Sequence, residues 1–183
     1  MLFLLYAEAL NAQAGKIDTT VKMGDAGFHV VCNNKNIDEN QVSIVPIGIK
    51  INSANPSFKV LGKVTKAFAD DMNDDGRPDL VICVYNGSNE EIGTVIGISY
   101  NADKGLDPIY FPDIYLDAKI RDGYKGHDEF STLTGTLLRK FPVYLPNDAP
   151  GKPTGGIRTI QYKVMNDGGR LTFKVLRWFD VKT

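Results

Sequence analysis

Residues 69–94 read ADDMNDDGRPDLVICVYNGSNEEIGT, and they set the pattern for the whole chain. An acidic turn comes first, then the apolar run from Leu80 to Tyr85, then a loop of small and polar residues. A short apolar run bounded by turn residues is typical of a buried β-strand. Because this strand gives it a rigid base, the loop from Asn86 to Gly93 is well suited to reach into another molecule.

Short strands and turns continue along the chain. The run from Val95 to Tyr100 is predicted to pair with the run from Leu80 to Tyr85 across that loop, as a hairpin. Two more hairpins are predicted around the turns at 134–135 and 166–169, which contain Gly, Asn and Asp. The sequence therefore predicts an all-β fold: one antiparallel β-sandwich or flattened barrel, with at most one short helix, at 112–120.

Two earlier runs are also strand-like. Residues 42–50 contain Pro46, and because proline cannot donate to a β-ladder, this run is predicted to lie at a sheet edge or a bulge. Residues 58–64 are predicted to form another strand.

The N-terminal segment is predicted to be removed from the mature protein. Residues 1–7 are apolar but too short to span a bilayer, and Ala12-Gln13-Ala14 is a pattern that signal peptidase accepts. The alternative is a first core strand. We expect an export signal over 1–14, cut after Ala14, one domain over 15–183, and a periplasmic or secreted location.

Charge excludes some partners. The chain has 22 acidic and 21 basic residues, and Glu8 is the one charged residue of the N-terminal segment, so 21 of each remain after cleavage. A neutral protein has no electrostatic reason to coat nucleic acid or an anionic membrane. We expect no nucleic-acid partner and no membrane insertion after signal removal.

Cys32 and Cys83 each lie in an apolar run. In an exported protein such a pair is a disulfide candidate, and two buried free thiols are the alternative. Neither has a His or Cys at ligand spacing, so a metal role is not expected.

The acidic turn matches the first nine positions of an EF-hand-type calcium loop. Side chains at alternate positions and one backbone carbonyl, that of Arg77, would supply the oxygens, so a structural calcium ion would be held by Asp71, Asn73, Asp75, Arg77 and Asp79. Ile82 stands where the twelfth-position Glu would be, which predicts modest affinity. The alternative is an Asx-rich turn that needs no ion.

The two histidines give little indication of catalysis. His127 stands before Asp128 and Glu129, but no Ser-His-Asp arrangement, zinc triad or phosphate loop accompanies it. We expect a turn or core-edge role for His127, turn and rim roles for Asp128 and Glu129, and no enzymatic activity.

Several blocks together resemble a known family, the bacterial periplasmic inhibitors of invertebrate-type (i-type) lysozyme. The similar blocks cover most of the chain from about Asp70 to Val164, and they are residues 71–80, 123–130, 135–144, the loop at 153–156 and the strand at 158–162. The acidic turn alone is shared by many β-proteins, and the second and third blocks make the resemblance more specific.

The resemblance implies an exported β-sandwich, a homodimer, that pushes a loop into the active-site cleft of a lysozyme, with the i-type enzyme favoured. The family's loop is rich in Ser and Gly and ends in Tyr-Gly. Here Ser88 matches the family's Ser, but Ile92 stands where the Tyr would be, and Glu90 and Glu91 add carboxylates that could meet basic residues of the enzyme. The implied lysozyme-binding residues are Gly87, Ser88, Asn89, Glu90, Glu91, Ile92 and Gly93.

Two other classes of function remain open from the residues. One is a calcium-stabilised adhesion or carbohydrate-binding module without catalysis, with a sugar platform made of Tyr85, Tyr110, Tyr124 and Trp178. The other is a hydrolase that uses His127, Asp128 and Glu129.

Overall fold

The computed structural model describes residues 15–51, 54–87, 91–101 and 105–182. Twelve strands form three antiparallel sheets, each of four strands in sequence order. The first sheet contains β1 (Ile17–Met23), β2 (Ala26–Cys32), β3 (Glu39–Ile47) and β4 (Ser57–Leu61). The second contains β5 (Lys63–Asp70), β6 (Asp79–Asn86), β7 (Ile92–Asn101) and β8 (Gly105–Ile109). The third contains β9 (Glu129–Thr132), β10 (Leu137–Pro142), β11 (Ile157–Asp167) and β12 (Arg170–Val181).

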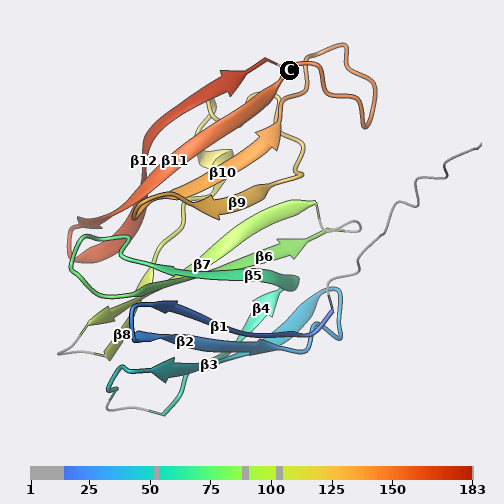
Figure 1. Ribbon diagram of the computed structural model, residues 1–183. Coiled ribbons are helices and arrows are strands. Elements are labelled where there is room, and N and C mark those ends of the chain that lie inside the picture. The colour runs from blue at the N-terminus through green and yellow to red at the C-terminus, as the bar shows by residue number, and fades with distance from the viewer. Residues whose placement is uncertain (1–14, 52–53, 88–90, 102–104, 183) are drawn as a thin grey trace, which may run out of the picture.

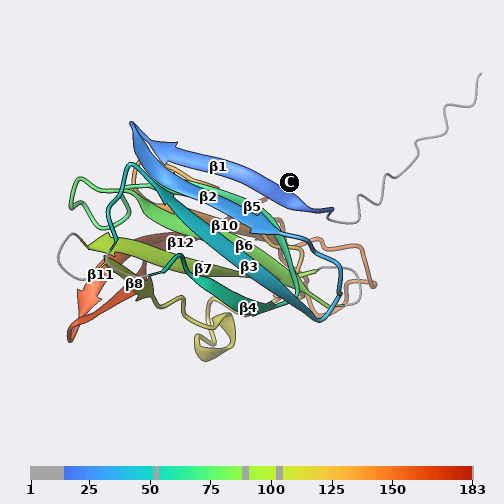
Figure 2. The same cartoon turned by 90° about the horizontal axis from the view of Figure 1, so that it is seen from below.

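The three sheets are stacked as layers, with the second sheet in the middle (Figure 1). Seen from below, β1, β2 and β3 lie in front of this middle sheet (Figure 2). The all-β prediction is confirmed, and none of the three sheets closes into a barrel. The sandwich has three layers because the middle sheet has an apolar surface on both faces.

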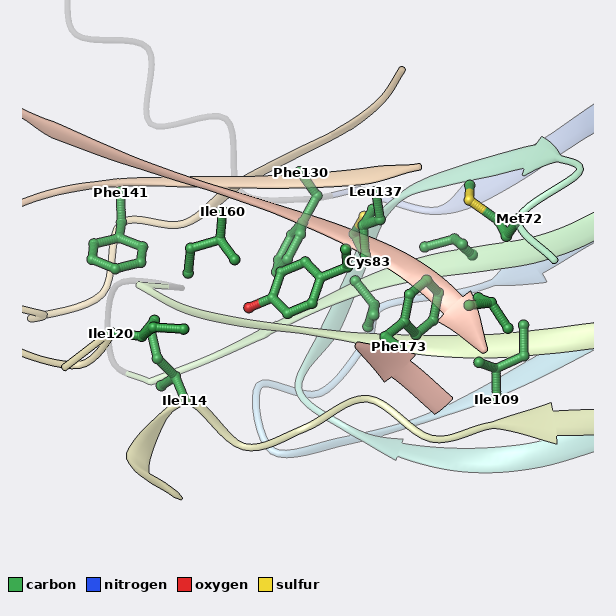
Figure 3. Packing of buried hydrophobic residues seen from close by; sticks show 14 of the residues in the cluster. Met72, Cys83, Ile109, Ile114, Ile120, Phe130, Leu137, Phe141, Ile160 and Phe173 are labelled. Carbon is green, nitrogen blue, oxygen red and sulfur yellow. The ribbon is translucent and has the colours of Figure 1, made fainter. Parts of the chain in front are cut away.

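Strand β6 shows how the sequence produces this arrangement. Alternate side chains of a strand point to opposite faces, and every residue from Asp79 to Val84 is buried. Leu80, Ile82 and Val84 belong to the core shared with the first sheet. Val81 and Cys83 belong to the core shared with the third sheet. Figure 3 shows Cys83 in this core together with Phe130, Leu137 and Phe173. A continuous apolar run therefore marks a strand that is covered on both sides.

The three predicted hairpins are confirmed. Strands β6 and β7 pair from Asp79↔Ser99 to Asn86↔Ile92, β9 pairs with β10, and β11 pairs with β12 through a bulge beside Gln161. The predicted short helix is one 3-10 turn, η1 (Ile114–Leu116), because Asp117 ends it with extended backbone.

Two early runs differ in detail from the prediction. Residues 58–64 do not form one strand: β4 ends at Leu61 and β5 begins at Lys63, because Gly62 bends the chain from the first sheet to the second with a φ of 112°. A side chain at Gly62 would lie 2.2 Å from the carbonyl oxygen of Tyr85. Pro46 lies in an inner strand, β3, but beyond the last pairing of β3 with β4 at Ser43↔Ser57, so its missing N–H breaks no bond between those two strands.

The two cysteines are free thiols. Cys32 lies in the core between the first and second sheets, and Cys83 lies in the core between the second and third. The middle sheet separates them, so the disulfide alternative does not hold. Burial raises the pKa of the Cys83 thiol to about 12. Within the described ranges, no helix is both long enough and apolar enough to cross a bilayer.

Candidate functional site

The 86–93 loop joins β6 to β7 in the middle sheet. Asn86 and Gly87 are exposed at its start, and Gly87 has a φ of 95° that favours glycine. At its end Ile92 is exposed, whereas Gly93 is buried. The predicted binding residues Ser88, Asn89 and Glu90 lie outside the described residues. The site is therefore built from the two ends of the loop and from the residues that hold them.

A buried ion pair holds the end of the loop. Arg139 of β10 donates from Nε to Oδ1 of Asp128 at 2.6 Å, and the two side chains are 3% and 0% exposed. Asp128 Oδ2 accepts from the Gly93 N–H at 2.8 Å, and Arg139 Nη2 donates to the Gly93 carbonyl oxygen at 3.2 Å. The pair thus bonds both backbone groups of Gly93, as a neighbouring strand would do. It also ties the middle sheet to the third sheet.

Tyrosine hydroxyls complete the network. Tyr124 donates to Asp128 Oδ2 at 2.5 Å and accepts from Arg139 at 3.0 Å, while Tyr85 donates to the Asp128 carbonyl oxygen at 2.8 Å. Burial disfavours the charged form of Arg139, but the hydrogen bond and charge of Asp128 outweigh it, so the pKa of Arg139 lies above its usual value. For Tyr85 and Tyr124, burial disfavours the charged phenolate and so raises the pKa of each hydroxyl. Arg139 therefore stays charged and the two tyrosines stay neutral at neutral pH.

Close packing requires glycine at two positions near the ion pair. A side chain at Gly93 would lie 2.7 Å from Asp128 and from Phe130, so the loop can approach the pair only as glycine. Gly126 has a φ of 86°, and a side chain there would lie 2.7 Å from the Glu91 carbonyl oxygen. The backbone N–H of His127 donates to that same oxygen at 2.6 Å. The 126–128 segment therefore holds Glu91 as well as Gly93.

The expected roles of residues 127–129 need one correction. His127 is exposed, with a φ of 62°, in the irregular segment before β9, and Glu129 is exposed at the start of β9. Asp128 is not a rim residue: it is buried because Arg139 neutralises its charge. Since Arg139, Tyr124 and Gly93 all bond its carboxylate, Asp128 has no free position from which to act as an acid or base.

Within the acidic turn, side chains bond the backbone. Asp71 accepts from the N–H groups of Asp75 and Gly76, at 3.0 and 2.8 Å. Asn73 Oδ1 accepts from the Asp75 N–H, and Asp75 accepts from the Arg77 N–H. These bonds close the turn without an ion. In the described part of the chain, no three Asp, Glu, His or Cys side chains are grouped to hold a metal.

Asp79, one of the predicted calcium ligands, lies in the core rather than at the surface. Its side chain is fully buried, and Oδ2 accepts from the Met72 N–H at 2.9 Å. Oδ1 is buried and makes no hydrogen bond with the described residues. Burial raises the pKa of Asp79 to about 7, and the charges of Asp75 and Asp71 add to this, although the Ser99 hydroxyl and the Met72 N–H act in the opposite direction. Oδ1 of Asp79 is the atom that would gain most from a cation.

The predicted sugar platform is not one surface. Tyr85 and Tyr124 are directed to Asp128 in the network described above. Tyr110 and Trp178 are exposed, but the guanidinium of Arg170 lies 4.6 Å from the Tyr110 ring and that of Arg158 lies 4.7 Å from the Trp178 ring. Two of the four aromatic residues therefore bond Asp128, and each of the other two lies against a different arginine.

Sequence reasoning missed the ion pair. The signal was present in β10, where alternation places Arg139 on the same face as the buried Leu137 and Phe141. A charged residue at an inward position requires a buried partner. The sequence offered no means of choosing Asp128 as that partner.

No protein-family model matches this chain, and no curated protein matches it.

Proposed function

We propose that this protein is an exported inhibitor of a lysozyme, with the i-type enzyme favoured, and that it acts without catalysis by inserting the 86–93 loop into the active-site cleft. The resemblance of the chain from about Asp70 to Val164 to the periplasmic inhibitors of i-type lysozyme supports this proposal. So does the ion pair of Asp128 and Arg139, which is the observation that carries it.

The ion pair is relevant because an inserted loop has to be held in shape before it binds. Fixing a loop in advance lowers the entropy lost on association. Asp128, Arg139 and His127 together bond the backbone of Glu91 and Gly93. Burying two charges costs free energy, which only close pairing and hydrogen bonds offset. A simple connector between two strands can be built without that cost.

The chemistry of the cleft fits such a loop. Glycosidases of this kind use two carboxylates that flank the sugar. In our proposal, Ser88 and Asn89 offer hydroxyl, amide and backbone donors to these carboxylates and exclude the substrate. Ile92, which is exposed at the end of the loop, provides apolar contact where the similar family has tyrosine.

Turnover assays of i-type, chicken-type and goose-type lysozymes, with micromolar mature protein added, test this function. We expect inhibition of the i-type enzyme. If none of the three enzymes is inhibited, the proposal is wrong.

The proposal includes export, with cleavage after Ala14, and a homodimer. Strand β12 lies at the edge of its sheet and exposes Leu176, Phe179 and Val181, which supports an interface there. Light scattering after size exclusion should give twice the chain mass. Leu176→Lys should shift the protein to monomer, whereas Leu61→Lys, on an exposed residue of the first sheet, should not; a monomer in all three samples would contradict the dimer.

A further inference from the structure

A groove of about 440 Å³ lies beside the end of the 86–93 loop. One wall is formed by the start of β7, residues 92–94, and the other by residues 110–115, which lead into η1. Arg139 also lines the groove. The residues that the ion pair holds in place therefore form one side of a second surface feature.

The wall formed by residues 110–115 offers aromatic rings and one carboxylate. Tyr110 and Tyr115 are 41% and 50% exposed, and both line the groove together with Asp113. Asp113 caps η1 through Oδ1, which accepts from the Tyr115 N–H at 2.9 Å. Among the described residues, no lysine or arginine forms an ion pair with Asp113. The groove thus contains a carboxylate that the described lysines and arginines leave without an ion pair.

A contact within the protein indicates which kind of ligand group binds against residues 110–115. On a neighbouring groove that shares Tyr110, Pro112, Asp113 and Ile114, the guanidinium of Arg170 lies against the Tyr110 ring. Among the described residues that line the groove beside the loop, the basic residue is Arg139, which is paired with Asp128. Cations bind over aromatic faces and pair with carboxylates. Arg170 therefore covers the Tyr110 ring, which lines both grooves, and Arg121 donates to the Tyr115 carbonyl oxygen at 3.1 Å, whereas the Asp113 carboxylate has no ion-pair partner among the described residues.

We propose that the groove between residues 92–94 and residues 110–115 receives a basic side chain, arginine or lysine, from the enzyme that the 86–93 loop enters. This inference rests on the proposed function and adds a second contact to it. Asp113 pairs with the cation, and Tyr115 covers it. The exposed tip of η1, where Leu116 is 77% exposed, packs against the same enzyme surface.

An aromatic residue lies across the groove from the end of the loop. Aromatic residues are enriched among the side chains that contribute most to interfaces. Ile92 lines one wall of the groove, and Tyr115 supplies an aromatic group on the other. A basic enzyme surface also favours a carboxylate at this place.

The test uses Asp113→Asn, with Asp25→Asn as the matched control. The amide introduced by Asp113→Asn keeps an oxygen that can cap η1, so the substitution removes charge and little else. Asp25 is exposed in the turn between β1 and β2 of the first sheet. For the full-length mature protein and an inhibited lysozyme, we expect Asp113→Asn to weaken inhibition on the order of tenfold at low salt, and less at high salt. Asp25→Asn should leave inhibition unchanged.

A second arm separates this inference from the proposed function. N-acetyl-arginine amide is titrated into the protein and followed by amide NMR, with N-acetyl-norleucine amide as the neutral probe. We expect shifts at residues 92–94 and 110–115 with the arginine probe only, and their loss in Asp113→Asn. If the wild type inhibits and Asp113→Asn inhibits equally well, the inference is overturned and the function stands. If no lysozyme is inhibited, the proposed function is wrong, and the arginine titration alone tests the groove. The absence of NMR shifts at residues 92–94 and 110–115 would then overturn the inference.

Discussion

Asp128 and Arg139 connect stability to function at the scale of single residues. Each side chain is almost fully buried, so neither can lose its partner and recover its hydration. The same two groups bond the backbone of Gly93 at the end of the loop. Two residues outside the 86–93 loop therefore hold its C-terminal end.

Removing one member of this pair should be costly. For Asp128→Ala, which leaves the Arg139 charge buried, we expect the free energy of unfolding to fall by about 3–5 kcal/mol. The measurement is urea unfolding at room temperature. The control is Asp180→Ala, since Asp180 pairs with Arg158 in the same sheet but is 33% exposed and does not touch the loop. Equal decreases in the free energy of unfolding for the two variants would show that the buried Asp128 pair contributes no more to stability than the Asp180 pair.

Prediction from sequence was weakest at this scale. Alternation along β10 could have revealed that Arg139 faces inward, but its partner lies eleven residues earlier, before a different strand. Side-chain pairing across sheets depends on the stacking of layers, which local patterns do not encode. Glu91 and Gly93, by contrast, were already among the predicted loop residues.

At the scale of an element, the acidic turn before β6 combines exposed carboxylates with the buried Asp79. The exposed groups close the turn through backbone N–H groups, and Asp79 anchors it to the core through Met72. The calcium ion predicted for this turn stays a prediction. Asp79 is the residue at which an ion-free turn and a calcium site differ most.

In the absence of calcium, Asp79 should make stability depend on pH. The pKa of its carboxyl group is raised by burial to about 7 in the folded protein, so the folded state binds a proton that the unfolded state releases near pH 4. The free energy of unfolding, measured in EDTA, should therefore fall as pH rises from about 4 to 7, by on the order of 2–4 kcal/mol. Asp79→Asn should flatten this profile and be the more stable protein at pH 8; a profile that is the same in both would contradict the account.

Calcium should narrow the stability difference between the wild type and Asp79→Asn if the turn binds it. At about 10 mM CaCl₂, a dissociation constant of about 0.1–1 mM stabilises the folded protein by about 1.4–2.7 kcal/mol. We expect the melting temperature of the wild type to rise on adding calcium, and that of Asp79→Asn to rise less. An unchanged melting temperature in both proteins would mean that the turn needs no ion.

Elements were the scale at which the sequence predicted most. The three hairpins were predicted because their runs alternate or are wholly apolar and their turns contain Gly, Asn or Asp. The division of residues 58–64 was not predicted, since the change of sheet at Gly62 depends on the nearby Tyr85 carbonyl. Likewise, the short helix was reduced to one turn by local capping at Asp113 and Asp117.

At the scale of the whole molecule, the decisive feature is the middle sheet with a core on each face. The apolar run of β6 is consistent with any strand covered on both sides, so the sequence predicted a sandwich but not the number of its layers. The layers also place the candidate site. The loop leaves the middle sheet, and its support comes from the third.

The three layers make a prediction about the cysteines. Because the middle sheet lies between them, Cys32 and Cys83 should remain reduced, and burial together with the high pKa of Cys83 should slow their reaction. Ellman's reagent at pH 8 should label neither thiol in the folded protein and both in guanidinium. Rapid labelling of Cys83 without denaturant would show that the core opens easily.

In the function proposed above, a loop held by a buried ion pair blocks a lysozyme. The most direct measurement compares the wild type with a variant lacking residues 87–91 in one i-type lysozyme assay, with melting temperatures recorded for both. We predict that the deletion abolishes inhibition while the three-layer fold still melts cooperatively, because both cores lie outside the deleted segment. If the shortened protein inhibits as well as the wild type, the loop is not the inhibitory element and the account is wrong.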